Sequence, residues 1–400
     1  MNRIVAIFLC FAAVFSLVAC GNGAETTESF SSGGDGLFPE ILTDSASSET
    51  TEEALPSDTD ATEVNSSTDT DTEDSAPTEL PKVGWDPEIP HKVIMDDSGT
   101  RILIADLNLC GDGPEDIVIE DCIVWEWDSV HAEGAQVQGK DLRIDEAGLR
   151  YSSYWEKDVV IFSGSGGWVG ILDYETKEVL FEDNPGNGPH SVELLPNGDL
   201  VVACSGNGST DQGEVLHYPL SEGKTSVGSR VPLKSAHGIC WDPQNEVLWV
   251  LGDTEIIACS VRNGELSVIS GMGASLKEIG HGGGHDLVPV YGQPGKYWVS
   301  GGKGIFLFDS ETETVTANYS RAAGYKGTNV KGIAWFPDGT MIQTAHDQGG
   351  TGTYRSSLLR VLYLGYSSGR VKQVTVKERM IPHREGSQTY KIHTLSKDYQ

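Results

Sequence analysis

The chain has 400 residues, with 59 acidic against 28 basic side chains and a formal net charge of −31. Such acidity argues against nucleic-acid partners, whose phosphates need a basic surface. The seven cysteines include no Cys-x-x-Cys pair, which argues against zinc or dithiol chemistry of that type.

The first 20 residues are typical of a targeting segment. Arg3 precedes an apolar run over Ile4–Val18, which is too short and wrongly flanked for a spanning helix. The run ends in Leu17-Val18-Ala19-Cys20, which resembles the lipobox of bacterial lipoproteins. The resemblance implies cleavage before Cys20 and acylation of its sulfur, for instance with palmitate. We therefore expect an extracytoplasmic, membrane-anchored lipoprotein of a bacterial cell envelope; an ordinary signal peptide is the alternative.

Residues 21–84 have the composition of a disordered tether. Between Gly21 and Pro81 there are sixteen acidic residues and no basic one, amid Ser, Thr, Gly and Ala. Such a segment buries too little apolar surface to fold, and its like charges extend it. We expect it to act as a stalk for a folded domain at residues 85–400.

A repeat organises that domain. The stretch Pro189–Cys204 reads as a strand, a two-residue Asn197-Gly198 turn and a second strand over Leu200–Cys204. Equivalent stretches follow downstream, and their marker residues His190, His237, His285 and Lys331 lie 47, 48 and 46 residues apart. Short strands at this period predict an all-β protein, a β-propeller with one four-stranded blade per repeat.

The ends of the domain predict how the ring closes. Lys92–Asp96, Arg101–Leu107 and Ile123–Trp127 supply three strands for the first blade, and Thr389–Leu395 is a spare strand at the C-terminus. Closing the first blade with that strand removes an open sheet edge and gives six blades. Seven blades is the alternative, if Ile381–Gly386 contains further strands. We expect a monomer.

The repeat resembles a family of uncharacterised secreted bacterial proteins with a six-bladed propeller fold. The residues that carry the resemblance are Pro189-His190-Ser191-Val192, His237-Gly238 with Trp241-Asp242, Gly283–Leu287 and Tyr390-Lys391. The resemblance implies the fold but no activity. More distantly, the pattern of one histidine per blade is similar to that of propeller lyases that act on streptogramins or pectic fragments. This is an analogy of fold alone.

The innermost strand of each blade lines the central channel, so the marker residues should meet near its mouth. In order around the ring they are Lys391, Arg150, His190, His237, His285 and Lys331. In one interpretation His190, His237 and His285 bind a divalent metal through neutral imidazoles, and the three cations hold an anion such as a uronate. In the other, the histidines form hydrogen bonds between blades and plug the channel.

Other candidates flank the mouth or lie elsewhere. His346, Asp347 and Trp168 are candidate ligand-binding residues near the mouth, although aromatic residues in propellers more often pack between blades. Cys110 and Cys122 are spaced for a disulfide in an extracytoplasmic domain.

These patterns leave two classes of function open. The first is a lipid-anchored binding module that captures a glycan-like or anionic ligand at the mouth, without a cofactor. The second is a metal-dependent lyase or hydrolase that acts on acidic saccharides. We rank binding first because no general base is evident in the sequence.

Overall fold

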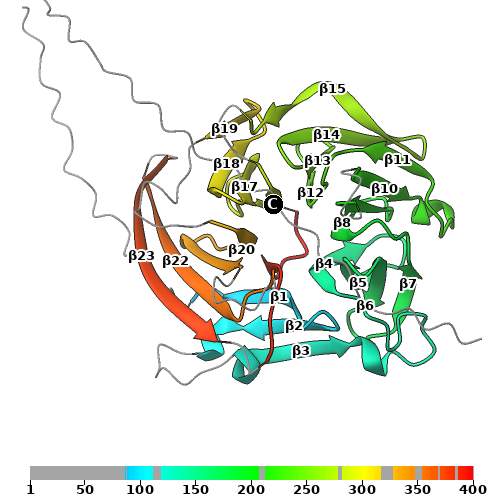
Figure 1. Cartoon of the computed structure of the whole chain (residues 1–400), viewed down its shortest axis with the longest axis horizontal. Helices are drawn as coiled ribbons and strands as arrows, with labels where there is room; N and C mark the ends of the chain where they lie inside the picture. Colours follow the sequence, from blue (N-terminus) through cyan, green and yellow to red (C-terminus); the bar gives the residue numbers. More distant parts are fainter. Residues whose placement is uncertain are drawn as a thin grey trace, which may run out of the picture. The chain divides into compact units, whose positions relative to one another are not determined.

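A computed structural model describes residues 86, 88–110, 119–206, 212–277, 282–316, 328–346, 354–367, 370–382 and 386–399. These residues form six four-stranded antiparallel sheets arranged around a central axis, as Figure 1 shows. The predicted six-bladed β-propeller is therefore confirmed. The expected signal peptide, the tether and Cys20 lie outside the described residues.

Each sheet forms one blade of the propeller. Blade 1 contains β1 (Lys92–Asp97), β2 (Arg101–Asp106), β3 (Ile123–Asp128) and β24 (Ile392–Thr394). Blade 2 contains β4 (Ile144–Ser152), β5 (Lys157–Gly164), β6 (Trp168–Asp173) and β7 (Val179–Asp183). Blade 3 contains β8 (Pro189–Leu194), β9 (Leu200–Cys204), β10 (Glu214–Tyr218) and β11 (Ser229–Pro232).

The second half of the ring follows the same order. Blade 4 contains β12 (Gly238–Asp242), β13 (Val247–Leu251), β14 (Glu255–Arg262) and β15 (Glu265–Ser275). Blade 5 contains β16 (Gly284–Pro289), β17 (Lys296–Gly301), β18 (Gly304–Asp309) and β19 (Thr314–Thr316). Blade 6 contains β20 (Val330–Trp335), β21 (Thr340–Ala345), β22 (Leu358–Ser367) and β23 (Arg370–Pro382).

The C-terminal strand closes the ring, as predicted. Ile392 of β24 pairs with Met95 of β1, which gives blade 1 its innermost strand. Ile392 is fully buried in a cluster that combines Val93 of blade 1 with Ile342 of blade 6. Ring closure therefore also completes an apolar interface between the first and last blades.

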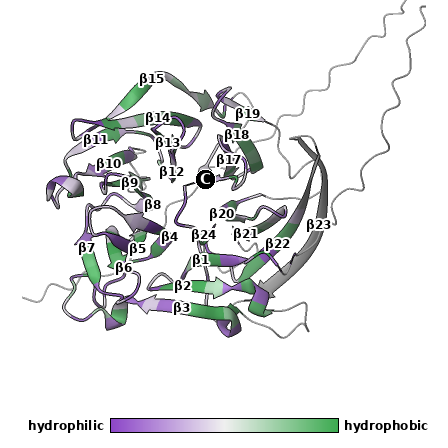
Figure 2. Cartoon of the chain, turned by 180° about the vertical axis from the view of Figure 1, so that it is seen from behind, coloured by the Kyte–Doolittle hydropathy of each residue, from purple (hydrophilic) through white to green (hydrophobic). Residues whose placement is uncertain are grey.

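The core is divided among the blade interfaces. Six buried clusters each combine residues of two adjacent blades. Figure 2 shows apolar residues along β2, β7 and β15, among other strands. Because each blade packs on both neighbours, the ring holds the innermost strands in fixed positions around the axis.

The turn between β8 and β9 differs from the predicted two-residue Asn-Gly hairpin. The Leu195 N–H donates to the Asp199 carbonyl, so three residues lie within the loop. Gly198 has φ of 93°, while Asn197 keeps a negative φ. Proline at position 196 favours this longer turn, because it has no N–H to donate to residue 199, as the closing pair of a two-residue Asn197-Gly198 turn would require.

The described part of the chain contains short 3-10 turns at Leu107–Cys110, Ile119–Cys122, Ser129–His131 and Leu220–Glu222. None of the helices described is long and apolar enough to cross a membrane.

Candidate ligand site at the mouth of the central channel

A β-bulge places the marker residue at the start of the innermost strand. In β8, Pro189 pairs with Cys204 and Ser191 with Ala203, so His190 between them is left out of the ladder. The same irregularity surrounds His285 in β16 and Lys331 in β20. Bulges redirect a side chain and are frequent beside functional sites. In blades 3, 5 and 6 the bulge thus turns the marker side chain toward the channel mouth.

In blade 2 the residue at this position is Asp145, and the prediction of Arg150 is wrong. The bulge of β4 lies between Ile144 and Glu146. β4 has nine residues, whereas β8 and β16 have six, so counting back from the second strand stops too early. The mouth therefore has a carboxylate where a cation was expected.

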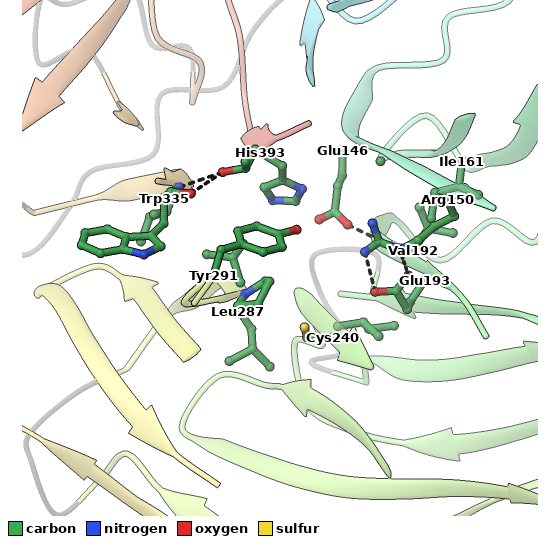
Figure 3. Close-up of a pocket in the computed structure, with 16 residues that line it drawn as sticks. Glu146, Arg150, Ile161, Val192, Glu193, Cys240, Leu287, Tyr291, Trp335 and His393 are labelled. Atoms are coloured by element: carbon green, nitrogen blue, oxygen red, sulfur yellow. Dashed lines mark hydrogen bonds and ion pairs between the residues drawn. The ribbon is translucent and has the colours of Figure 1, made fainter. Parts of the chain in front are cut away.

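Arg150 lies five residues further along β4, about 16 Å away at 3.3 Å per residue. Its guanidinium binds both carboxylate oxygens of Glu193, at 2.7 and 2.8 Å. It also donates to the Ser396 carbonyl and stacks on Tyr399, 5.1 Å from the ring centroid. Figure 3 shows this pair and Tyr291 among the residues that line a pocket. The cavity has a volume of about 30 Å³. Arg150 thus fastens the C-terminal tail across the far end of the channel.

The three histidines do meet at the mouth. The rings of His190 and His237 stack with centroids 4.4 Å apart, and His285 meets His237 edge-on at 5.3 Å. Asp145 Oδ2 lies 3.0 Å from His190 Nδ1, and His237 Nδ1–H donates to the Ser235 carbonyl at 2.9 Å. Burial, reinforced by the neighbouring His190 and His285 rings, holds the pKa of His237 well below its ordinary value. His237 is therefore a neutral ring whose Nε2 is an acceptor.

Lys331 lies beside these rings. Its ammonium donates to His285 Nε2 at 2.7 Å. It also faces Tyr354 and Tyr390, at 5.5 and 5.7 Å from the ring centroids. Lys331 is 5% exposed, and burial together with the nearby charge of Lys391 lowers its pKa from 10.5 to about 8. Among the residues described, no carboxylate pairs with this amine within 4 Å.

Lys391 has different surroundings. Its ammonium donates to Glu146 at 2.6 Å and to the His237 carbonyl at 2.7 Å, and Asp286 lies at 3.4 Å. Burial opposes its charge, but Glu146 and Asp286 outweigh burial and raise its pKa. Lys391 is 1% exposed, so its positive charge is balanced inside the protein by these carboxylates.

Glu146, Asp286 and His393 form the one cluster among the described residues whose ligand atoms lie within 4.8 Å of one another. Such a group has the donors of a metal site. The ammonium of Lys391 already bridges its two carboxylates, however, and His393 Nε2 contacts Asp286 at 3.1 Å. Burial favours neutral His393, but Asp286 outweighs it and raises the pKa of the ring. The negative charges of Glu146 and Asp286 are thus balanced by Lys391 and His393.

The side chains directly after the marker residues join the blades. Ser191 Oγ donates to Glu146 at 2.7 Å and accepts from Ile239 N–H at 3.1 Å. The residues after His237 and Lys331 are glycines because the next blade leaves no room for a side chain. A Cβ on Gly238 would lie 2.8 Å from the Leu287 nitrogen, and one on Gly332 would lie 2.5 Å from the Ile392 nitrogen. Hydrogen bonds between blades are therefore made by the residue after His190, whereas the sequence interpretation assigned them to the histidines themselves.

The remaining predicted residues lie apart from this ring or at its border. Trp168 packs against the apolar cluster between blades 1 and 2. The His346 ring lies 5.7 Å from Tyr354, at the border of the mouth. Asp347 falls outside the described residues. Cys110 and Cys122 are joined in a disulfide, with Cα atoms 5.8 Å apart.

Sequence reasoning missed a second layer of the site. Arg355 pairs with Asp145 at 3.0 Å and with the buried Asp96, and its guanidinium lies 5.9 Å from the Tyr390 ring centroid. Burial disfavours the Asp145 carboxylate, but His190 and then Arg355 outweigh burial and lower its pKa. Tyr354 and Arg355 could have been found from their position in the connection from β21 to β22, because that connection lies at the mouth of the channel.

Residues 108–352 match the model of a family of unknown function, DUF6528. The chain belongs to this family. The resemblance to a family of uncharacterised proteins is therefore confirmed. The matched range contains the three histidines and Lys331, and it ends before Tyr354 and Lys391. No curated protein matches the chain.

The solved structures that match this DUF6528 protein share little sequence with it. A functionally unknown protein from Desulfotomaculum acetoxidans DSM 771 has 13% identity and a TM-score of 0.44, over 72% of this chain and 79% of that one. Dihydro-heme d1 dehydrogenase NirN has 13% identity and a TM-score of 0.42, over 76% and 57%. The Cps50 (Swd1) β-propeller domain of Myceliophteria thermophila has 14% identity and a TM-score of 0.38, over 59% and 70%.

Proposed function

We propose that the mouth of the channel binds the anionic group of a small ligand, with Lys331 as its counter-charge. The observation that carries this proposal is a contrast among the channel cations. Arg150, Arg355 and Lys391 each contact carboxylates, whereas Lys331 contacts an imidazole and two tyrosine rings. Among the described residues Lys331 has no carboxylate partner; burying an ammonium in this way is costly, and a ligand carboxylate would supply the counter-ion.

The surroundings of Lys331 favour an acidic saccharide. Tyr354 is 69% exposed, and its ring lies next to both Lys331 and His346. An exposed aromatic face beside a cation suits a sugar ring that carries a carboxylate, because the apolar face stacks while the charge pairs. The proposed ligand is therefore a uronate or a related acidic sugar.

Calorimetric titration of the full-length protein with galacturonate and with galactose tests the proposal. Galacturonate should bind at least about tenfold more tightly, as expected for one charge-assisted contact worth about 1.5 kcal/mol or more. Lys331→Met should remove this preference, and Lys140→Met, a change at an exposed lysine, should leave it intact. Equal binding of the two sugars, or an unchanged preference in Lys331→Met, would contradict the proposal.

A metal-dependent lyase or hydrolase is the second candidate. It is supported by His190 and His237, whose Nδ1 atoms face Asp145 and the Ser235 carbonyl and leave Nε2 as the ligand atom. Metal-binding histidines are commonly oriented in this way. His285 weakens the case, because its Nε2 accepts from Lys331. Elemental analysis of protein purified without chelator decides between the two: a stoichiometric divalent ion that is lost in His237→Ala would favour the enzyme.

We also propose that the propeller is held at a membrane outside the cytoplasm by a lipidated Cys20, as the N-terminal sequence suggests. Cys20→Ser should then release the protein from the detergent phase in phase partitioning. A mutant that still partitions with detergent would overturn the anchor without affecting the proposed site.

A further inference from the structure

The chemistry of Lys331 is determined by what its nitrogen touches. Its hydrogen-bond partner is His285 Nε2, and the rings of Tyr354 and Tyr390 lie on its other sides. The charged groups that act on it are Lys391, which disfavours its protonation, and Asp145, which favours it.

These surroundings are those of a reactive amine. Lysines become nucleophilic when burial or a neighbouring cation favours the neutral form, and Lys331 has both influences. The imidazole of His285 is within hydrogen-bonding distance and can accept the proton that the ammonium must lose. Lys391 is the internal contrast, since two carboxylates keep it charged.

We propose that Lys331 captures a carbonyl compound as an imine, and that the ligand class is the oxo acids, including the open-chain form of an acidic reducing sugar. This inference rests on the anion site proposed above. The neutral Lys331 Nζ attacks the carbonyl carbon, a C–N bond forms, and the carbonyl oxygen takes up a proton. The carbinolamine then loses water to give a C=N bond. The reaction consumes amine and carbonyl and releases one water, without an oxidant or a reductant.

An acid group on the carbonyl compound suits the site both before and after the reaction. A protonated imine retains the positive charge of Lys331, so the carboxylate keeps its counter-ion. The exposed ring of Tyr354 beside the nitrogen provides a face for the rest of the ligand. The same residue would therefore attract the acid and react with its carbonyl.

The test uses glyoxylate, the smallest oxo acid, with cyanoborohydride on the full-length protein near neutral pH. The reductant converts an imine to a stable carboxymethyl amine, which peptide mass spectrometry locates. We expect Lys331 to be modified at least about tenfold faster than the exposed Lys140, because burial and Lys391 lower the pKa of Lys331 to about 8. Lys391 should stay unmodified. The lysines are compared within one wild-type chain, so this result does not depend on the folding of a variant.

Two variants separate this inference from the proposed anion site. His285→Gln should slow modification of Lys331 by removing the proton acceptor. Lys331→Arg should keep galacturonate binding and lose the label. Modification spread evenly over surface lysines would overturn the imine, and the anion site would stand if galacturonate still bound in a Lys331-dependent way. Failure of both the labelling and the galacturonate titration would overturn both proposals.

Discussion

Lys331→Met is expected to make the folded protein more stable at neutral pH. The amine is buried, and its pKa falls from 10.5 to about 8. At about 1.4 kcal/mol per pKa unit, keeping Lys331 charged in the folded protein costs about 3 kcal/mol. Methionine has a similar unbranched shape without the charge, but it gives up the hydrogen bond to His285, worth about 1 kcal/mol. The net gain is about 2 kcal/mol.

Thermal and denaturant unfolding measure this difference. For a domain of this size, about 2 kcal/mol corresponds to a rise in Tm of about 2–4 °C. The gain should also depend on pH with a definite sign. Between about 8 and 10.5 the unfolded chain binds a proton that the folded chain does not, so the wild type gains stability as pH rises. The advantage of Lys331→Met should therefore shrink across that window.

Lys391→Met is the matched control, since it makes the same chemical change in the neighbouring strand. It leaves Glu146 and Asp286 buried without their cation, which should cost about 3–5 kcal/mol. Opposite signs for the two variants are expected. A Lys331→Met protein that is less stable than the wild type at neutral pH, or whose stability difference does not change between about 8 and 10.5, would refute the reasoning.

Three further predictions concern the ring. If the mouth is a binding site, His237→Ala should abolish ligand binding with little loss of stability. A purely structural role for His237 predicts instead a loss of about 1–3 kcal/mol in stability and no change in ligand affinity. Measuring Tm and ligand binding on this one variant decides between the two. Removing residues from Tyr390 onward should abolish cooperative melting, because β24 and the buried Ile392 are lost; a truncated chain that melts like the intact one would show that ring closure is dispensable. Burial alone would raise the pKa of Asp286, but His393 and Lys391 outweigh burial and lower it. The ionised carboxylate therefore stabilises the fold above about pH 3.8, and this stabilisation disappears as pH falls through the lower pKa of the folded state. Asp286→Asn should flatten the acid limb of the curve of stability against pH, and an unchanged acid limb would contradict this role.

The fold was predictable because the repeat encodes it locally. Strand pairs with short turns recur at a nearly constant period, and each can be recognised without knowing its neighbours. The spare strand at Thr389–Leu395 had one open sheet edge to fill, which is where β24 lies. The Asn197-Gly198 turn shows the limit, since Pro196 changes the loop geometry and leaves the pairing of the strands intact.

The site was predictable only in part, because the position of a bulge depends on the register between two strands. The three histidines and Lys331 are in the ring, but counting back from β5 leads to Arg150, because β4 is longer than the other innermost strands. A better signal was available. A polar residue or glycine follows each bulged residue, as in His190-Ser191 and Lys331-Gly332, and Asp145-Glu146 has this pattern whereas Arg150-Tyr151 does not.

Charge balance could not be deduced from the sequence at all. Lys331 and Lys391 look alike in the repeat, yet one contacts an imidazole and the other two carboxylates. The difference arises from side chains on distant strands, such as Glu146 and Asp286, which only the closed ring brings together.

Described side chains occupy the channel at two levels. Lys391, Glu146 and Asp286 fill the axis below the histidines, and Arg150 with Tyr399 fastens the tail across the other end. A polymer therefore cannot thread through the propeller. The site is suited to terminal groups, so a chain-like ligand would present its end and leave the rest outside. Binding and release must use the same entrance, and a bulky adduct at that entrance should slow both rates while changing the affinity little.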